Sequence, residues 1–221
     1  MGTIAASVIL NRASQTLIDE TGGTWSPSEM LGHLNAGISA TVSHKPDTST
    51  LTEYVTLVAG PVQYLPAAGT QFLDALANGE GKVVFVKPRN DIDHADPEWY
   101  SATPTANFRH VMVDNRDPRR FLVHPPATAG AELLCCYAVA PTRLTAPTDI
   151  FPLPDIYESA LHAWVVGYAL AKTSKRGDMV RAQVWLSQWA NSLGVHAQVQ
   201  QMITPMPPEE TPTSINTAGA L

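Results

Sequence analysis

The sequence predicts an α+β fold, in which a helical core carries an antiparallel β insert. Three observations lead to this prediction. Apolar residues recur at helical spacing near both ends of the chain, the middle alternates apolar and polar residues, and the turns in the middle are short. Short turns join antiparallel strands, whereas parallel strands need long crossover connections.

Residues 1–48 are expected to form an α-helical hairpin. Its first helix, at residues 3–20, ends at a Thr-Gly-Gly sequence. Its second helix begins after Ser26, which can cap free backbone amides, with Glu29 completing a capping box, and it ends near His44. The apolar stripe of the first helix comprises Ala6, Ile9, Leu10, Ala13 and Leu17.

Residues 49–149 are expected to form the β-rich insert, an antiparallel meander. A return strand at 62–65 would pair with the strand at 50–58, and a strand at 120–124 would end sharply at His124 because two prolines follow. The predicted strands are 50–58, 62–65, 82–87, 109–114, 120–124 and 132–139. One or two helical turns are predicted at 71–77, and a short helix with a loop at 91–100.

Residues 150–200 are expected to add two helices that complete one α-helical domain with residues 1–48. The remaining segment, 201–221, is rich in proline and is predicted to be a flexible tail. The first of these helices has an apolar face of Tyr157, Leu161, Trp164, Val165 and Tyr168. The second has one of Ala182, Trp185, Leu186, Trp189 and Leu193.

The composition excludes several classes of protein. Of 221 residues, 44% are apolar and 15% charged, and the net charge of −6 argues against a general phosphate-binding surface. No apolar run is long enough for a membrane span, so no membrane is expected as a partner. The two cysteines are adjacent, which excludes a disulfide framework. No phosphate loop, dinucleotide fingerprint, zinc helix or calcium loop occurs, and we expect no cofactor.

Three features could carry chemistry, and each is better interpreted structurally. The acidic run from Asp91 to Asp96, which contains Asp93 and His94, has metal-binding donors but is more typical of a solvated turn or a helix cap. His124 is interpreted as a strand end, and the cysteine pair as partly buried small residues on a strand. We therefore predict no catalytic, cofactor-binding or metal-binding residue, and no enzyme.

Two further groups are candidates for contact with other molecules. One is aromatic and is interpreted either as core or as the buried centre of a subunit or portal contact: Tyr157, Trp164, Tyr168, Trp185 and Trp189. The other is basic and is interpreted either as a DNA or partner contact or as charge that complements helix ends: Lys172, Lys175, Arg176 and Arg181.

Four sequence phrases suggest a family. They are the Phe-Leu-Val-His-Pro-Pro phrase at 121–126, the strand pair at 52–58 and 63–65 that ends in Tyr-Leu-Pro, the acidic-aromatic lead at 149–157, and the long helix after the Lys-Arg-Gly-Asp of 175–178. Together with the order of elements over residues 3–200, they resemble the head-to-tail adaptor proteins of tailed bacteriophages, and most of all the tail tubular protein A type of short-tailed phages.

The resemblance implies a non-enzymatic structural virion protein at the neck, assembled in the host cytoplasm. It implies a ring, commonly of twelve copies, that lies between the portal protein and the tail nozzle or tube and extends the DNA channel. Genomic DNA would pass without sequence-specific binding. The helices at 154–200 would face the portal and neighbouring subunits, and the β insert at 50–140 would face the tail.

Two alternatives stay open at this point. One is a tail-terminator or neck protein of another lineage. The other is a small hydrolase that uses His124 or the acidic run at 91–96 in a pocket between the β insert and the helices, which would require a concave site with perturbed carboxylates.

Overall fold

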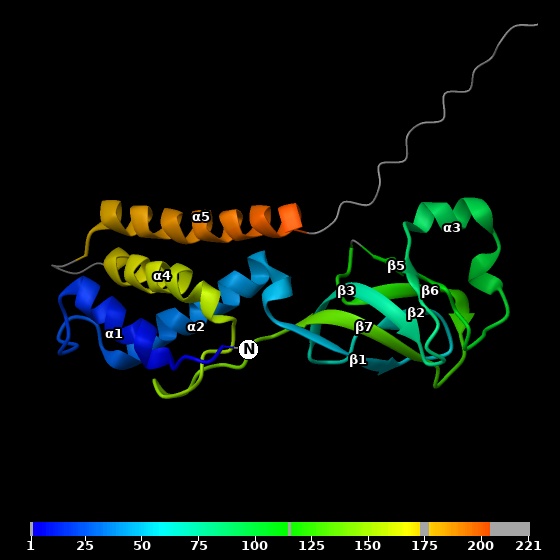
Figure 1. The fold of residues 1–221 in the computed structure, drawn as a ribbon, viewed down its shortest axis with the longest axis horizontal. Helices are drawn as coiled ribbons and strands as arrows, with labels where there is room; N and C mark the ends of the chain where they lie inside the picture. The colour runs from blue at the N-terminus through cyan, green and yellow to red at the C-terminus, as the bar shows by residue number, and fades with distance from the viewer. Residues whose placement is uncertain (1, 115, 173–176, 204–221) are drawn as a thin grey trace, which may run out of the picture.

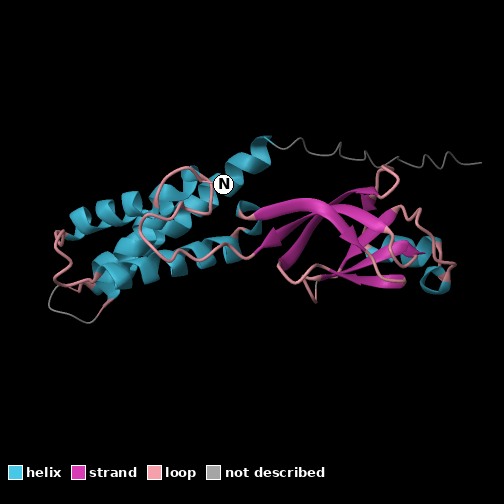
Figure 2. Ribbon diagram, turned by 90° about the horizontal axis from the view of Figure 1, so that it is seen from below, coloured by secondary structure: helices cyan, strands magenta, loops and turns pink. Residues whose placement is uncertain are grey.

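The computed structural model describes residues 2–114, 116–172 and 177–203. The molecule is elongated, with helices in one half and strands in the other (Figures 1 and 2). Each half has its own hydrophobic core. The fold class is therefore α+β, as predicted.

The helical half has three layers. Helix α4 (Glu158–Ala171) lies in the middle, with α5 (Met179–Ile203) on one side and α1 (Ala6–Leu17) and α2 (Pro27–His44) on the other (Figure 1). Because α4 is covered from both sides, ten of its 14 residues are buried, and its apolar residues do not form a single stripe. Helix α5 extends to Ile203, so the predicted tail boundary at 201 falls inside this helix.

Local hydrogen bonds stabilise the turn and the helix start of the predicted hairpin of α1 and α2. The Glu29 N–H donates to Ser26 Oγ at 3.3 Å, which is the predicted N-terminal cap of α2. Between the helices, the buried Asp19 carboxylate accepts backbone N–H bonds from the turn, including those of Gly23 and Trp25, at 2.9–3.0 Å. The first helix ends at Ile18, which takes the left-handed conformation with φ 55°. The hairpin prediction is confirmed.

Helices α2 and α4 pack closely at Gly37. A Cβ atom at this position would lie 2.6 Å from Trp164 Cδ1 and 3.0 Å from Leu161 Cδ2. Only the absence of a side chain on α2 lets the Trp164 ring pack directly on that helix, with its Nε1–H donating to the carbonyl of His33 at 3.1 Å.

The β half contains two sheets that share one core. Their strand orders are β1-β7-β3 and β2-β6-β5-β4. The core contains Val55, Phe72 and Tyr137 from the first sheet and Val111 and Phe121 from the second. The strands are β1 (Thr50–Thr56), β2 (Gly60–Tyr64), β3 (Gly69–Asn78), β4 (Phe85–Val86), β5 (His110–Val113), β6 (Arg120–Ala127) and β7 (Glu132–Val139).

The predicted meander is wrong. Strand β1 pairs with β7 and β2 pairs with β6, so the segments at 50–58 and 62–65 belong to different sheets, and β4 runs parallel to β5. The cause is the corner between β1 and β2. Gln63, 1% exposed, accepts from the Val58 N–H at 2.9 Å and donates to the carbonyls of Val58 and Gly60 at 2.8 Å. These hydrogen bonds fix the backbone between β1 and β2, and β2 pairs with β6 and not with β1.

The predicted helical turns at 71–77 are also wrong, because this segment is strand β3. Its register along β7 shifts three times, and the bulges convert the usual period of two into a period of three. Gly69, Phe72, Ala75 and Asn78 are consequently the buried positions. Buried residues spaced three apart produce the same sequence pattern as one face of a helix, which explains the wrong prediction.

The other β elements differ from prediction mainly in length. Strand β6 passes His124 and continues to Ala127, because its prolines lie where the pairing with β2 is irregular and few ladder bonds are needed. Only residues 85–86 of the predicted strand at 82–87 are in a ladder. The short helix and loop predicted at 91–100 are confirmed as α3 (Arg89–Ala95) and a 3-10 turn at Trp99–Ser101.

Two segments connect the halves, residues 45–49 and 140–149. The second segment is held on α2 by Asn35, whose amide donates to the Leu144 carbonyl at 3.0 Å and accepts from the Leu144 N–H at 2.9 Å. Further along, Asp155 accepts from the N–H and hydroxyl of Thr3, which ties the start of the chain to α4.

Candidate interaction surfaces

The predicted aromatic residues cluster around α4. Trp164 stacks on Tyr168 with a centroid distance of 4.4 Å and contacts Trp189 edge-on at 4.6 Å. Tyr157, Trp164 and Trp189 are buried in the helical core, whereas Tyr168 is 40% exposed. Trp185 is half-buried against His162. Tyr168 and Trp185 thus keep surface that another chain could cover, and the other three act within this chain.

The predicted basic cluster lies at the end of the helical half away from the strands, as far as the structure describes it. Lys172 Nζ donates to Glu29 Oε2 at 2.8 Å, so this cation is paired within the chain. Arg181 is exposed and lines a hollow of about 310 Å³ together with Ile18 and Trp25. Lys175 and Arg176 lie outside the described residues.

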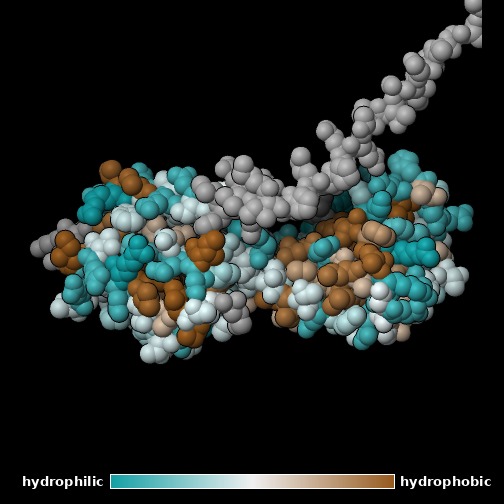
Figure 3. Space-filling model, in the orientation of Figure 1, coloured by the Kyte–Doolittle hydropathy of each residue, from teal (hydrophilic) through white to brown (hydrophobic). Residues whose placement is uncertain are grey.

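The β half exposes apolar side chains at a sheet edge. In the described residues, β4 is paired in its sheet with β5 alone, so it is an edge strand. The N–H of Val84, just before β4, donates to the Leu76 carbonyl at 3.1 Å, which places this edge beside β3. Figure 3 shows apolar surface gathered over this half of the molecule. The exposed apolar residues beside this edge are Leu76, Val83, Phe85 and Val86. Open edges with apolar side chains are typical of sites where another chain docks.

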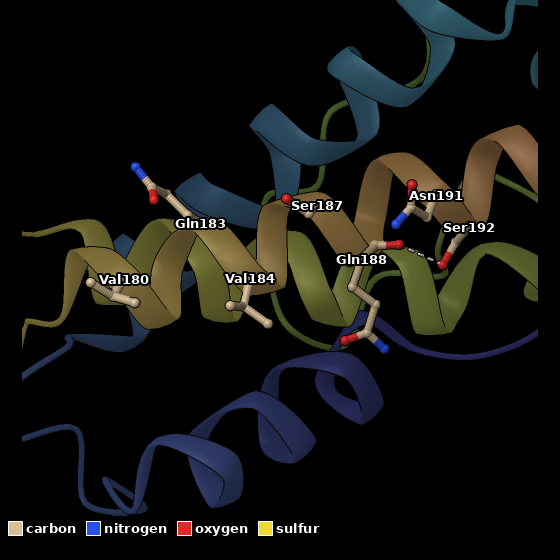
Figure 4. Close-up of a pocket in the computed structure, with 7 residues that line it drawn as sticks. All are labelled: Val180, Gln183, Val184, Ser187, Gln188, Asn191 and Ser192. Atoms are coloured by element: carbon tan, nitrogen blue, oxygen red, sulfur yellow. Dashed lines mark hydrogen bonds between the residues drawn. The ribbon is translucent and has the colours of Figure 1, made fainter.

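The outer face of α5 forms a hollow. It is shallow, measures about 760 Å³ and is lined from Val180 to Ser192 by residues of α5 itself. Figure 4 shows Val184, Gln188 and Asn191 projecting from this face. Val180 and Val184 are 72% and 64% exposed. Prediction from the sequence missed this surface, although the absence of Asp, Glu, Lys and Arg from residues 182–203 signals it.

A second hollow lies on the opposite side of the helical half, over α2. It measures about 270 Å³ and is formed by small residues of α2, including Gly32, Ala36 and Ser39, and by the connecting residues Pro141 to Arg143. The sequence from 30 to 44 also contains no Asp, Glu, Lys or Arg. This surface was likewise not predicted.

The residue that the hydrolase alternative would use, His124, belongs to a histidine pair. His110 and His124 are cross-strand neighbours with stacked rings and 3.4 Å between their Nδ1 atoms, and His124 Nε2 lies 3.4 Å from Asp96 Oδ2. Burial raises the pKa of the Cys135 thiol to about 12, which keeps it protonated. His124 also contacts the Trp99 ring edge-on, with a centroid distance of 6.2 Å.

The acidic run is engaged in local contacts. Asp93 accepts from Arg89 Nε at 3.1 Å and from Trp99 Nε1 at 2.7 Å, and the His94 ring bonds to the Asn90 carbonyl. Over the residues that the structure describes, no three His, Cys, Asp or Glu side chains are arranged to hold a metal ion. None of the helices described there is long and apolar enough to cross a bilayer.

Three histidines predict a loss of stability in mild acid. Burial is the main cause that lowers the pKa of His33, His110 and His162 below the usual 6.5. The unfolded chain therefore binds more protons than the folded one as pH falls through 6.5. Stability is fully present above about pH 6.5 and is lost below it, with a slope of up to about 1.4 kcal/mol per pH unit for each histidine.

Urea unfolding measured from about pH 7.5 to about pH 5.5 tests this expectation. Hydrogen bonds from Thr3 lower the pKa of Asp155 below its ordinary 3.8, so this carboxylate changes the stability only at a pH below the measured window. His162→Gln should flatten the slope. A free energy of unfolding that stays constant across the window in the unaltered protein would contradict the prediction.

Comparison with protein families gives one match over most of the chain. The family model described as SU10 adaptor protein matches residues 4–209. Comparison with curated proteins gives no match. The matched range includes the helices on both sides of the β half and all seven strands.

Proposed function

Because the chain belongs to the SU10 adaptor protein family, whose members are structural adaptors between the head and tail of phage virions, we propose that it forms a ring under the portal of a short-tailed phage. The ring, of twelve copies, extends the DNA channel toward the tail nozzle or tube. The family match carries this proposal. It favours the adaptor over the tail-terminator, neck-protein and hydrolase alternatives.

The two-part shape supports an axial arrangement. We place the helical half toward the portal and neighbouring copies, and the β half toward the tail. The exposed edge at β4, with Phe85 and Val86, then lies on the half that meets the tail protein. Tyr168 and Trp185 contribute to contacts in the helical half, and Lys172 and Arg181 belong to its far end, where a partner or passing DNA is met.

Electron microscopy of the chain mixed with purified portal rings tests the proposal. We expect an added ring of density on the portal and a shift of the protein from monomer to a portal-bound fraction in sedimentation. The chain remaining monomeric beside intact portal would overturn the proposal.

The orientation has a separate test. A photo-crosslinking residue at Tyr168 should capture portal or a neighbouring copy, and one at Phe85 should capture the tail protein. Capture of portal by the Phe85 position would reverse the assignment while leaving the ring intact.

A further inference from the structure

A pair of histidines lies on the face of the second sheet that is turned away from the core of the β half. His110 on β5 and His124 on β6 are directly opposite each other in the ladder. Their neighbours Val111 and Val123 belong to the core, and alternate residues of a strand point to opposite faces. Both imidazoles are half-buried, so a small ion can reach them from solvent.

The two rings direct one nitrogen each toward the other. The Nδ1 atoms of His110 and His124 are 3.4 Å apart, whereas the ring centroids are 5.6 Å apart, so each Nδ1 lies on the side of its ring that is nearer the other ring. A neutral imidazole carries one N–H and one lone pair. Two lone pairs that face each other repel, as do two N–H groups, so a proton or a metal ion between the nitrogens stabilises this arrangement.

The separation of the two nitrogens fits a metal ion better than a shared proton. In protein N–H···O hydrogen bonds the donor and acceptor atoms are about 2.7–3.2 Å apart. A tetrahedral zinc ion binds imidazole nitrogens at about 2.0–2.1 Å, which places two of its ligand nitrogens about 3.3–3.4 Å from each other. The 3.4 Å between His110 Nδ1 and His124 Nδ1 agrees with the second spacing.

A carboxylate lies at the other nitrogen of His124. Asp96 Oδ2 is 3.4 Å from His124 Nε2, and Asp96 Oδ1 accepts from the Glu98 N–H at 3.3 Å, which orients the carboxylate. An N–H on Nε2 that points at this carboxylate leaves the lone pair on Nδ1, where a metal ion would bind. Histidines that bind metal ions are ordinarily held in this way by a carboxylate behind the ring.

The charges around the pair are mixed. Asp96 attracts a cation, whereas Lys87 and Arg109 lie close enough to His110 to repel one. Charge alone therefore does not hold a cation here, and bonds from the nitrogens must supply the affinity. Imidazole suits zinc, copper and nickel, whereas calcium and magnesium require oxygen ligands. The pair should consequently discriminate between these two groups of ions.

We propose that His110 and His124 bind one divalent ion of the zinc and copper group through their Nδ1 atoms, and that Asp96 positions His124. In the part of the chain that the structure describes, no group of three His, Cys, Asp or Glu side chains forms a metal site. Water or a side chain of another molecule therefore takes the remaining positions around the ion. This inference goes beyond the proposed adaptor role and does not depend on it.

Calorimetric titration with ZnCl₂ tests the site in the full chain, prepared without a polyhistidine tag. We expect one ion per chain, and His110→Gln or His124→Gln should each weaken binding at least about tenfold. Excess Mg²⁺ or Ca²⁺ should not displace the zinc. His94→Gln is the matched control, because it removes an exposed imidazole of α3 that bonds to the Asn90 carbonyl, and it should bind zinc like the unaltered chain.

Asp96→Asn tests the positioning residue, since it keeps both ligands and removes the charge behind His124. It should weaken zinc binding about tenfold without changing the number of ions bound. An unchanged affinity would reject the role of Asp96. Circular dichroism of every variant separates a loss of binding from a loss of folding.

Nitrogen NMR of the imidazole rings identifies the atoms that bind. Zinc should shift the Nδ1 resonances of His110 and His124 and leave the proton on His124 Nε2. Spectra in which these two rings do not respond to zinc would overturn the proposal and leave a proton between the nitrogens. Zinc binding that survives both His→Gln substitutions would also overturn it. A chain that binds zinc at this pair but forms no ring on portal would reject the proposed function and keep the site.

Discussion

Trp164→Ala is expected to lower the free energy of unfolding by about 3–5 kcal/mol. The Trp164 ring is only 8% exposed and joins three helices of the helical half, stacking on Tyr168 of α4, meeting Trp189 of α5 edge-on and packing on Gly37 of α2. Its removal leaves a cavity between these helices and deletes the hydrogen bond from Trp164 Nε1 to the His33 carbonyl. Urea unfolding followed by circular dichroism measures the change.

Tyr168→Ala is the comparison, because its ring takes part in the same stack but is 40% exposed. It should cost about 1 kcal/mol. If Trp164→Ala unfolded like the unaltered chain and lost only its assembly on portal, Trp164 would be an interface residue and the core interpretation would fail.

Gly37→Ala is expected to destabilise the protein by about 1–3 kcal/mol, although alanine is the better helix former. The added methyl group would lie 2.6 Å from Trp164 Cδ1 and 2.9 Å from its Cγ, so α2 and α4 must separate or the indole must turn. This cost outweighs the gain in helix propensity of about 1 kcal/mol.

Gly32→Ala in the same helix is the matched control. Nothing lies within 4 Å of a Cβ atom there, so only the propensity term acts and the monomer should gain up to about 1 kcal/mol. The two glycines thus predict opposite signs for one substitution in one helix. Thermal unfolding of both variants in the absence of portal checks this, and equal shifts in the same direction would refute the close packing of α2 on α4.

The helical elements could be predicted because their signals are local. The Ser26 cap and the apolar spacing of α1 depend on residues within a few positions of one another, and the structure contains both. The first helix ends at Leu17, before the predicted Thr-Gly-Gly ending, because Ile18 takes the left-handed conformation. The α+β class could be predicted for the same reason. Helix ends shifted by a few residues, as with α1, which begins at Ala6.

The pairing of the strands could not be predicted, because it depends on contacts between distant residues. Gln63, a polar residue, is buried and turns the chain from one sheet to the other, and no local pattern signals this. In β3, bulges move the burial pattern from period two to period three, so the segment at 71–77 resembles helical turns in the sequence. Periodicity indicates a strand only where its register is regular.

The candidate residues show what sequence can and cannot assign. Helical spacing correctly marked Trp164 and Trp189 as inward-facing, but it does not distinguish burial within one chain from burial between chains. The structure places both in the core of this chain. Ser187 and Asn191 on the outer face of α5 are ordinary polar residues when each is considered alone. Only the absence of Asp, Glu, Lys and Arg from residues 182–203 distinguishes this face in the sequence.

The β half leaves the helical half and returns to it at one place. Thr50 pairs with Ala138, and the Val139 N–H donates to the Ser49 carbonyl at 2.8 Å, so the two ends of this half lie side by side. A segment whose ends meet can be exchanged for another of different length or shape without moving the surroundings of its attachment points. The β half can therefore be exchanged as a unit while the helical half keeps its own internal contacts.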